Sequence, residues 1–233
     1  MSRAIRRSGG SGGGLVWKLV LDSVMTLLVI AEFAYDVTGS IVHEVIGLVL
    51  LVLFVVHLLI NRQWFMTFFK GRQNMRRAAN SGINLLVLGV ALTLLGSGLL
   101  NASLIEMLAH FRWSFSTRGV HSLAGYWFLL AMAVHLGMHW GVVLGECRRR
   151  LGMVGRAHGI EVLVLRVAAV LCVMGGGTAA VHQELWSRLL ADYSFGYWDG
   201  GAVLHDFADF AAMVAGMAVL AHYLKGRLPA AGR

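Results

Sequence analysis

The sequence contains little proline, cysteine or charge for its length. One proline and two cysteines occur among 233 residues, and 14% of the residues are charged. Cys147 and Cys172 form no closely spaced pair and no C-x-x-C-H motif, so we expect neither a disulfide framework nor covalently attached c-type haem. The chain also contains no P-loop and no G-x-G-x-x-G motif in a strand context. The sequence therefore has no known motif for a soluble dinucleotide cofactor.

Apolar residues make up 58% of the chain, which is too many for an ordinary soluble domain. A helix crosses the hydrocarbon core of a bilayer in roughly 20 apolar residues. The first apolar window lacks a small-residue cleavage site, so we interpret it as a retained helix and not as a signal peptide. We predict an all-α integral membrane protein with six transmembrane helices, at about residues 15–35, 41–60, 83–100, 119–145, 160–181 and 201–224.

The net charge of +8 is distributed unevenly between the segments that connect these windows. Only three Lys or Arg residues lie in the connecting segments of one side. Basic segments stay in the cytoplasm. The side with more Lys and Arg, which includes both termini, is therefore predicted to be cytoplasmic. The charge is thus a topology signal with some attraction to anionic membrane lipid, and we expect no nucleic-acid partner. Fifteen of the twenty Lys and Arg residues lie in the predicted cytoplasmic segments 1–14, 61–82, 146–159 and 225–233.

Two of the windows share a histidine pattern. "HEVIGLVLLVLFVVH" runs from His43 to His57, and "HSLAGYWFLLAMAVH" runs from His121 to His135. Fourteen residues of helix return to within about 40° of the starting direction and rise about 21 Å. Each helix therefore presents two histidines on one face, one near each membrane surface. Because the second and fourth helices run parallel, we expect His43 to lie beside His121 and His57 beside His135.

Two stacked pairs of histidines on parallel helices are typical of haem ligation, because a haem iron takes two axial imidazoles from opposite faces. Filling both axial positions leaves no open site for substrate, so such a haem would carry electrons. Gly47 and Gly125, one turn after the first histidine of each pattern, would leave room for a porphyrin. Taken singly, each glycine is a helix-packing residue and each histidine an interhelical hydrogen-bonding group. Zinc or copper would need three or four donors around one ion.

His139 is an alternative ligand at the inner site. It follows His135 by one turn and lies five full turns after His121, so its direction also fits. The matched register with His57 favours His135. His139 would then bond a haem propionate, support a quinone or serve as a packing group. Of the other histidines, His205 and His222 form a weaker candidate pair for a third cofactor, and His110, His158 and His182 are interpreted as solvated residues in loops or at helix ends.

Charged residues near the predicted outer surface are candidates for a supporting role. Arg112 and Arg118 could neutralise the propionates of an outer haem. A quinol site needs a proton acceptor near the surface, so the outer acidic residues are candidates for one, although simple interfacial polarity also explains them. These acidic residues are Glu32, Asp36, Glu44, Asp206 and Asp209.

These features resemble the four-helix, twin-haem b-type cytochromes. The closer resemblance is to a family of small bacterial membrane cytochromes that is defined by a domain of unknown function. Members of this family are often found with flavinylated electron-transfer proteins. The resemblance runs through "KLVLDSVMTLLVIAEFAYDVTGSIVHEVIGLVLLVLFVVHLLINRQWF", "RGVHSLAGYWFLLAMAVHLGMHW" and "SFGYWDG", which are spread along residues 17 to 225. "TGSIVHEVIG" and "HLLINRQW" are its most specific parts.

The resemblance implies two non-covalent haems b and electron transfer across a bacterial cytoplasmic membrane. It implies His43, His57, His121 and His135 as the ligands. The implied partners are a periplasmic flavin-bearing protein or another redox subunit, with a quinone as a further candidate. The chain carries no flavin-attachment sequence, so any flavin would belong to another polypeptide. The chain would then be a redox subunit and not a stand-alone enzyme.

Two other functional classes remain open. Intramembrane histidines also mark ion pathways, so the same residues fit a proton- or metal-ion-conducting transporter. The lack of paired helix breaks counts against this, although "GGG" at 175–177 is a local exception. A structural membrane anchor would differ mainly in lacking the haems. The predicted organisation is a flexible basic and glycine-rich tail (1–14), a four-helix haem-binding bundle (15–145), a basic loop (146–159), two further transmembrane helices (160–225) and a second tail (226–233).

Overall fold

The computed structural model is helical throughout the residues it describes, which are 11–33, 35–70, 74–103, 115–152, 159–191 and 203–229. Two short helices, α3 (Arg62–Thr67) and α8 (Leu185–Leu189), follow long ones. The long helices are α1 (Ser11–Glu32), α2 (Tyr35–Ile60), α4 (Met75–Asn101), α6 (Phe115–Arg150), α7 (Gly159–His182) and α9 (Val203–Arg227).

Among the described residues, six helices are long and apolar enough to cross a membrane, which confirms the six predicted windows. The largest difference is at α4, which begins eight residues before the predicted window. Its first turn is polar, and the Asn74 side chain caps it by accepting a hydrogen bond of 2.8 Å from the Arg77 backbone N–H. A hydropathy pattern does not register a capped polar turn. α6 likewise continues past the predicted window into a basic last turn, which suits the negative end of the helix dipole.

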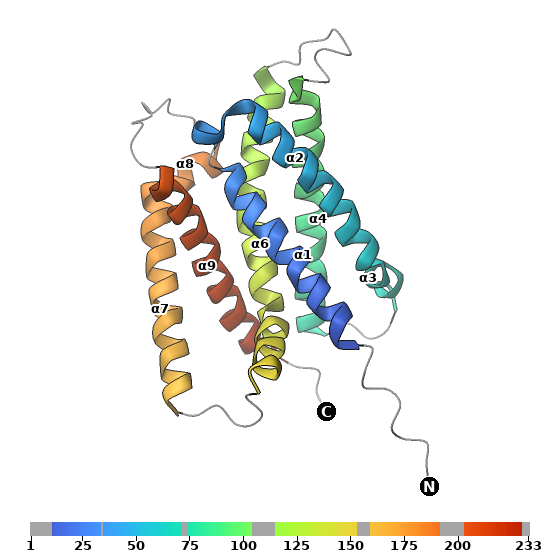
Figure 1. The fold of residues 1–233 in the computed structure, drawn as a ribbon, viewed down its shortest axis with the longest axis vertical. Coiled ribbons are helices and arrows are strands. Elements are labelled where there is room, and N and C mark those ends of the chain that lie inside the picture. The colour runs from blue at the N-terminus through green and yellow to red at the C-terminus, as the bar shows by residue number, and fades with distance from the viewer. Residues whose placement is uncertain are drawn as a thin grey trace.

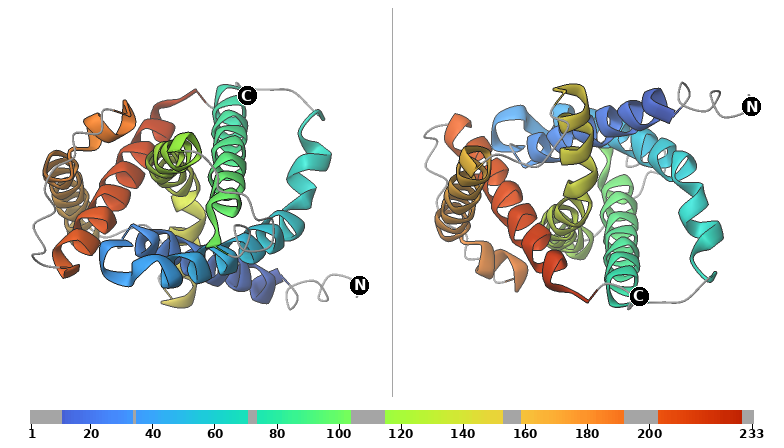
Figure 2. Two further views of the ribbon diagram at one scale, coloured as in Figure 1. Left: turned by 90° about the horizontal axis from the view of Figure 1, so that it is seen from above. Right: turned by 90° about the horizontal axis from the view of Figure 1, so that it is seen from below.

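Consecutive long helices run in opposite directions, so α2 and α6 are parallel as predicted (Figure 1). We call the end at which α2, α6 and α9 finish the basic end, and the opposite end the far end. Seen along the helices, α7, α9, α6 and α4 stand in a row, and α1 and α2 lie along one side of it (Figure 2). α2 packs mainly on α1 and only lightly on α4. α2 and α6 make little direct contact with each other, so their packing does not fill the space between them.

Glycine allows the backbones of the row to approach one another closely. A Cβ atom on Gly176 of α7 would lie 2.7 Å from the Ala212 carbonyl oxygen of α9. A Cβ on Gly216 of α9 would lie 2.7 Å from the Cys172 carbonyl oxygen of α7. Small residues commonly bring helices together in membranes, where lipid removes the hydrophobic driving force for their association. The "GGG" segment is therefore part of a continuous helix and provides a packing surface, not a break.

The buried core lies where α6 meets its neighbours. Leu129 and Ala133 of α6 and Phe210 and Met213 of α9 are almost fully buried. Large apolar side chains on the outside of α7 are exposed, as expected for a helix that faces lipid. They include Leu163, Val167, Val170, Leu171 and Met174.

Candidate functional site

At the far end, the structure brings His43 of α2 and His121 of α6 together. Their ring centroids are 6.0 Å apart and their planes are nearly perpendicular, at 84°. This is the first of the two predicted pairs. Gly47 has nothing within 4 Å of the place where a Cβ would stand, so α2 leaves open space one turn below His43. Gly125, by contrast, makes ordinary contacts, since its Cβ would lie 3.9 Å from Leu94 Cδ1.

The imidazole of His43 is oriented by a carboxylate from α1. Its Nδ1 lies 2.6 Å from Glu32 Oε2, at ion-pair distance but without good hydrogen-bond angles. The Glu32 side chain is only 14% exposed. Tyr35 adds an edge-to-face contact, with ring centroids 5.1 Å apart. A neutral His43 ring with its proton on Nδ1, toward this carboxylate, has its lone pair on Nε2.

His121 is oriented by the backbone of α4. Its Nδ1 lies 3.1 Å from the Leu94 carbonyl oxygen and 3.3 Å from Ser97 Oγ. A carbonyl oxygen only accepts hydrogen bonds, so Nδ1 must carry the proton and Nε2 is again left with its lone pair. Gly98 makes room for the ring, because a Cβ there would lie 3.0 Å from His121 Cε1. His121 therefore has the tautomer that a metal ligand bound through Nε2 requires, and the carboxylate beside His43 Nδ1 suits the same tautomer.

At the basic end, His57 of α2 has the same kind of partner as His43. Its Nδ1 lies 2.8 Å from Asp22 Oδ1 of α1. Asn61 donates a 3.0 Å hydrogen bond to the His57 carbonyl oxygen, and its Oδ1 accepts a hydrogen bond of 3.2 Å from Lys18 Nζ. These contacts tie the start of α1 to the end of α2. α1 thus supplies one carboxylate to each histidine of α2.

The partner of His57 on α6 is less defined. Within the described residues, the His57 ring makes no ring contact with His135 or with His139. The rings of His135 and His139 contact each other, with centroids 4.7 Å apart. The Asn84 side chain satisfies its neighbours when its oxygen accepts from Trp64 Nε1 at 3.1 Å and its nitrogen faces His135 Nδ1 at 3.0 Å. In that orientation His135 Nδ1 accepts and Nε2 carries the proton, which is opposite to the far-end pair. The second predicted pair is therefore not assembled in the way the first is.

His139 has an unsatisfied nitrogen beside a cavity. Among the described residues, its Nε2 is buried and has no hydrogen-bond partner. The cavity has a volume of about 530 Å³ and lies between α3, α4 and α6. Trp64 and Arg77 line it together with Asn84 and His139. A buried imidazole nitrogen without a partner is costly, so this arrangement fits a site that holds a further group.

The outer acidic residues divide between two places. Glu32 faces His43, and Glu44 accepts hydrogen bonds from the Ser103 backbone N–H and hydroxyl at 3.1 and 2.6 Å. Asp206 and Asp209 lie on α9 and accept from Gln183 instead, at 2.9 and 3.1 Å. The described residues therefore do not form one acidic quinol site. Asp22, which the sequence analysis did not single out, has a detectable signal, because an acidic residue inside an apolar window is rare.

The structure places His182 and His205 together. His182 is exposed at the end of α7, as predicted, and its Nδ1 also lies 2.6 Å from Asp209 Oδ2. His205 contacts the same carboxylate and not His222, whose ring packs on Tyr223. Arg118 is exposed. Several predictions lie outside the described residues: those for His110, Arg112 and His158, for the "SFGYWDG" segment, and for the Asp36 side chain.

Comparison with known proteins adds no family to these observations. No model of a protein family, no curated protein and no solved structure matches the chain. The functional argument therefore depends on the residues described above.

Proposed function

We propose that this chain is a membrane electron-transfer protein that binds two b-type haems non-covalently between α2 and α6. His43 and His121 would hold the haem at the far end. His57 would hold the other haem, together with His135 or His139. When bound, each haem supplies reversible one-electron redox chemistry. With two imidazole ligands for each haem, the protein would pass electrons and would not activate a substrate.

The pairing of His43 with His121 carries the proposal. With a metal–nitrogen bond of about 2 Å, two imidazoles on opposite sides of one ion have ring centres roughly 6 Å apart. The observed centroid separation is 6.0 Å. The two rings come from helices that scarcely pack on each other, and the space beside Gly47 is open. An ordinary interhelical hydrogen bond would not require either feature.

The orientation of the ligands supports the same reading. Histidines that bind a metal usually donate their second ring N–H to a carboxylate, a backbone carbonyl or water, which fixes the tautomer and makes the ligand more basic. Asp22 fills this role for His57, and the Leu94 carbonyl fills it for His121. Glu32 lies at ion-pair distance from His43 Nδ1, so a carboxylate or carbonyl oxygen faces Nδ1 in three of the proposed ligands.

The fourth ligand is a choice between neighbours on α6. Register with His57 favours His135, whereas the contact with Asn84 leaves His135 with its proton on Nε2. His139 has a buried Nε2 without a partner among the described residues. In the opposite orientation of the Asn84 amide, its oxygen faces His135 Nδ1, which would leave His135 Nε2 free for ligation at the cost of the Asn84 hydrogen bond from Trp64. The two assignments are separated by substitution, as described below.

The proposed setting is the cytoplasmic membrane of a bacterium, with the basic end in the cytoplasm. Arg76 and Arg77 in the first turn of α4 and the basic last turns of α6 and α9 all lie at that end. Electrons would then pass between the two faces of the membrane. The proposed partners are a flavin-bearing redox protein on the periplasmic side and a quinone.

A proton-conducting transporter is the second candidate, and the two carboxylate–histidine contacts favour it. Asp22 with His57 and Glu32 with His43 are the kind of ionisable pairs that line proton pathways in membranes. The pairs lie at opposite ends of α2, about 21 Å apart by helix rise. Proton transfer between them would need intervening polar groups, and apart from Glu44 beside His43 the stretch of α2 between the histidines is apolar.

Haem content of single-histidine variants tests the proposal. The full chain would be purified from haem-replete cells and assayed as the pyridine haemochrome. We expect His43→Ala and His121→Ala each to remove the same half of the haem, and His57→Ala to remove the other half. His222→Ala is the matched control, because it removes a histidine of α9 outside both sites.

The same series assigns the fourth ligand. If His135 is the ligand, His135→Ala removes the basic-end haem and His139→Ala leaves both haems bound. The reverse result moves the ligand by one turn to His139. A chain without haem, or equal loss of both haems in every variant, would contradict the proposed pairing and favour the transporter.

A further inference from the structure

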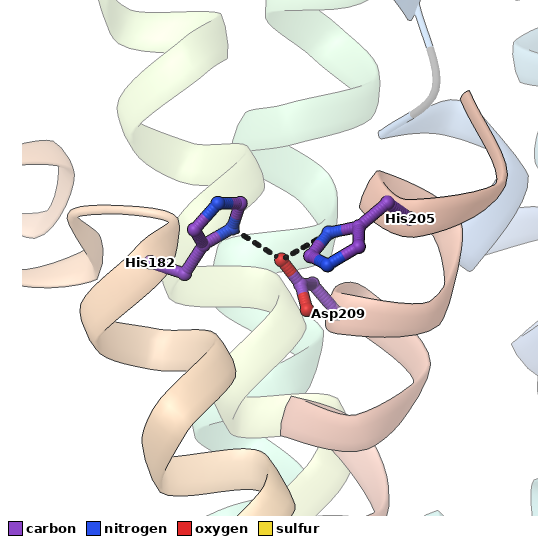
Figure 3. Close-up of side chains that lie close together, drawn as sticks. All are labelled: His182, His205 and Asp209. Atoms are coloured by element: carbon purple, nitrogen blue, oxygen red, sulfur yellow. Dashed lines mark hydrogen bonds and ion pairs between the residues drawn. The ribbon is translucent and has the colours of Figure 1, made fainter. Parts of the chain in front are cut away.

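A second cluster of ligating side chains lies at the far end, between α7 and α9 (Figure 3). His182 ends α7, and His205 and Asp209 lie one turn apart at the start of α9. The Nδ1 atoms of the two histidines lie 2.6 and 3.5 Å from the same oxygen, Asp209 Oδ2. One potential ligand atom from each residue lies within 4.8 Å of the others. This cluster takes no part in the proposed haem sites.

We propose that His182, His205 and Asp209 form a binding site for one divalent transition-metal ion of the zinc type. Two imidazoles and one carboxylate are a donor set that Zn²⁺ commonly takes, with a fourth position left for water or an external ligand. Imidazole nitrogens favour zinc and its neighbours over magnesium or calcium, which prefer oxygen ligands.

The positions of the donor atoms require only a small adjustment. A tetrahedral zinc ion with bonds of about 2.0–2.1 Å keeps its ligand atoms roughly 3.3 Å from one another. The two measured nitrogen–oxygen distances, 2.6 and 3.5 Å, lie on either side of that value. The side chains of His182 and His205 are 58% and 61% exposed, so both rings are free to turn. An ion can also reach them from the aqueous phase at the end of the spans.

The carboxylate is held in place independently of the histidines. The Asp209 side chain is only 14% exposed, and its Oδ2 accepts a hydrogen bond of 3.1 Å from Gln183 Nε2. Gln183 is itself buried and also donates to Asp206 Oδ1 at 2.9 Å. Hydrogen bonds of this kind orient the ligating carboxylates of metal sites. The cluster thus combines two movable imidazoles with one fixed carboxylate.

Metal binding at this position would connect the end of α7 to the start of α9. His182 comes from one helix, and the other two donors come from the second helix at i, i+4 spacing. Such an ion would restrain the two helices at the membrane surface while leaving a coordination position open. Nearer the middle of the two helices, α7 and α9 already pack closely at Gly176 and Gly216. The ion would therefore fix the far end of the same interface.

The test is a zinc-binding titration of the full purified chain with ZnCl₂, in competition with a zinc-sensitive dye. We expect one tight site per chain. His182→Ala, His205→Ala and Asp209→Asn should each weaken binding at least tenfold. His222→Ala is the matched control on α9 and should bind zinc as the unsubstituted chain does. Circular dichroism and gel filtration verify that each variant keeps its fold, as expected because the side chains of both histidines are exposed.

A second measurement reports on the ligands directly. X-ray absorption at the zinc edge should show imidazole scattering that falls when His182 or His205 is replaced. Unchanged zinc affinity in all three variants would overturn the proposal and leave the cluster as an ion pair. The same conclusion would follow if zinc bound with equal strength to the His222→Ala and His182→Ala chains and showed no imidazole scattering. Neither result depends on whether haem is bound between α2 and α6.

Discussion

If the chain binds the two proposed haems, replacing Glu32 by glutamine should change the redox potential of the haem at His43 and leave the other nearly unchanged. Glu32 lies 2.6 Å from His43 Nδ1 and is 14% exposed, so its charge is poorly screened by water. Glutamine keeps the shape of the side chain and an oxygen acceptor, but it removes the negative charge. The oxidised haem carries one more positive charge than the reduced haem, and a nearby carboxylate therefore stabilises the oxidised form. Its loss should raise the midpoint potential.

The size of the shift follows from the usual effect of such supporting contacts. Removing one typically changes metal affinity 10- to 100-fold. If the protein loses affinity mainly for the oxidised haem, the midpoint potential rises by about 60 to 120 mV. A tenfold change in the ratio of the two affinities corresponds to about 59 mV for a one-electron couple. Asp22→Asn is the matched variant at the other haem. The Asp22 side chain is 42% exposed, so we expect the same direction and a smaller shift.

A spectroelectrochemical titration of the purified protein measures both effects, because the two haems appear as separate one-electron steps. Glu32→Gln should move one step and Asp22→Asn the other. A shift of both steps by the same amount in each variant would refute the assignment of one carboxylate to each haem. No shift in either variant would show that the two carboxylates do not face haem ligands.

Two substitutions of glycine provide further predictions. Gly98→Leu should displace His121, because even a Cβ would lie 3.0 Å from that ring, and should reduce far-end haem content; Gly96→Leu, with nothing within 4 Å, is the control. Gly216→Ala should lower stability by about 1–3 kcal/mol through overpacking against α7, whereas Gly177→Ala faces open space and should not, as thermal unfolding in detergent would show.

The six spans and the first histidine pair follow from the sequence for a clear physical reason. The length of an apolar run and the direction of a side chain around a helix both depend only on residues near one another in the chain. Fourteen-residue spacing therefore predicted that His43 and His121 meet, and the structure brings their rings to 6.0 Å.

The partners of those histidines depend on how neighbouring helices are rotated and offset, which the spacing within one helix does not determine. Glu32 and Asp22 contact α2 because α1 packs antiparallel to it, and His121 contacts a backbone carbonyl of α4 that no side-chain pattern could reveal. The far-end cluster was missed for the same reason. His205 and Asp209 show i, i+4 spacing, but the third donor comes from α7.

The short helices and the cap of α4 were also not predicted. α3 and α8 are too short to show a hydrophobic period, and each follows directly on a long helix. Asparagine is a common N-cap residue, but several polar residues precede the apolar window. The sequence therefore does not show which of them caps α4.

The absorbance spectrum of the purified chain, with its iron and protoporphyrin content, tests the central claim most directly. The account predicts two haems b per chain, with a Soret band and a reduced-minus-oxidised α band, and loss of one haem in His43→Ala. A colourless protein from haem-replete cells, folded by circular dichroism and free of iron, would contradict it.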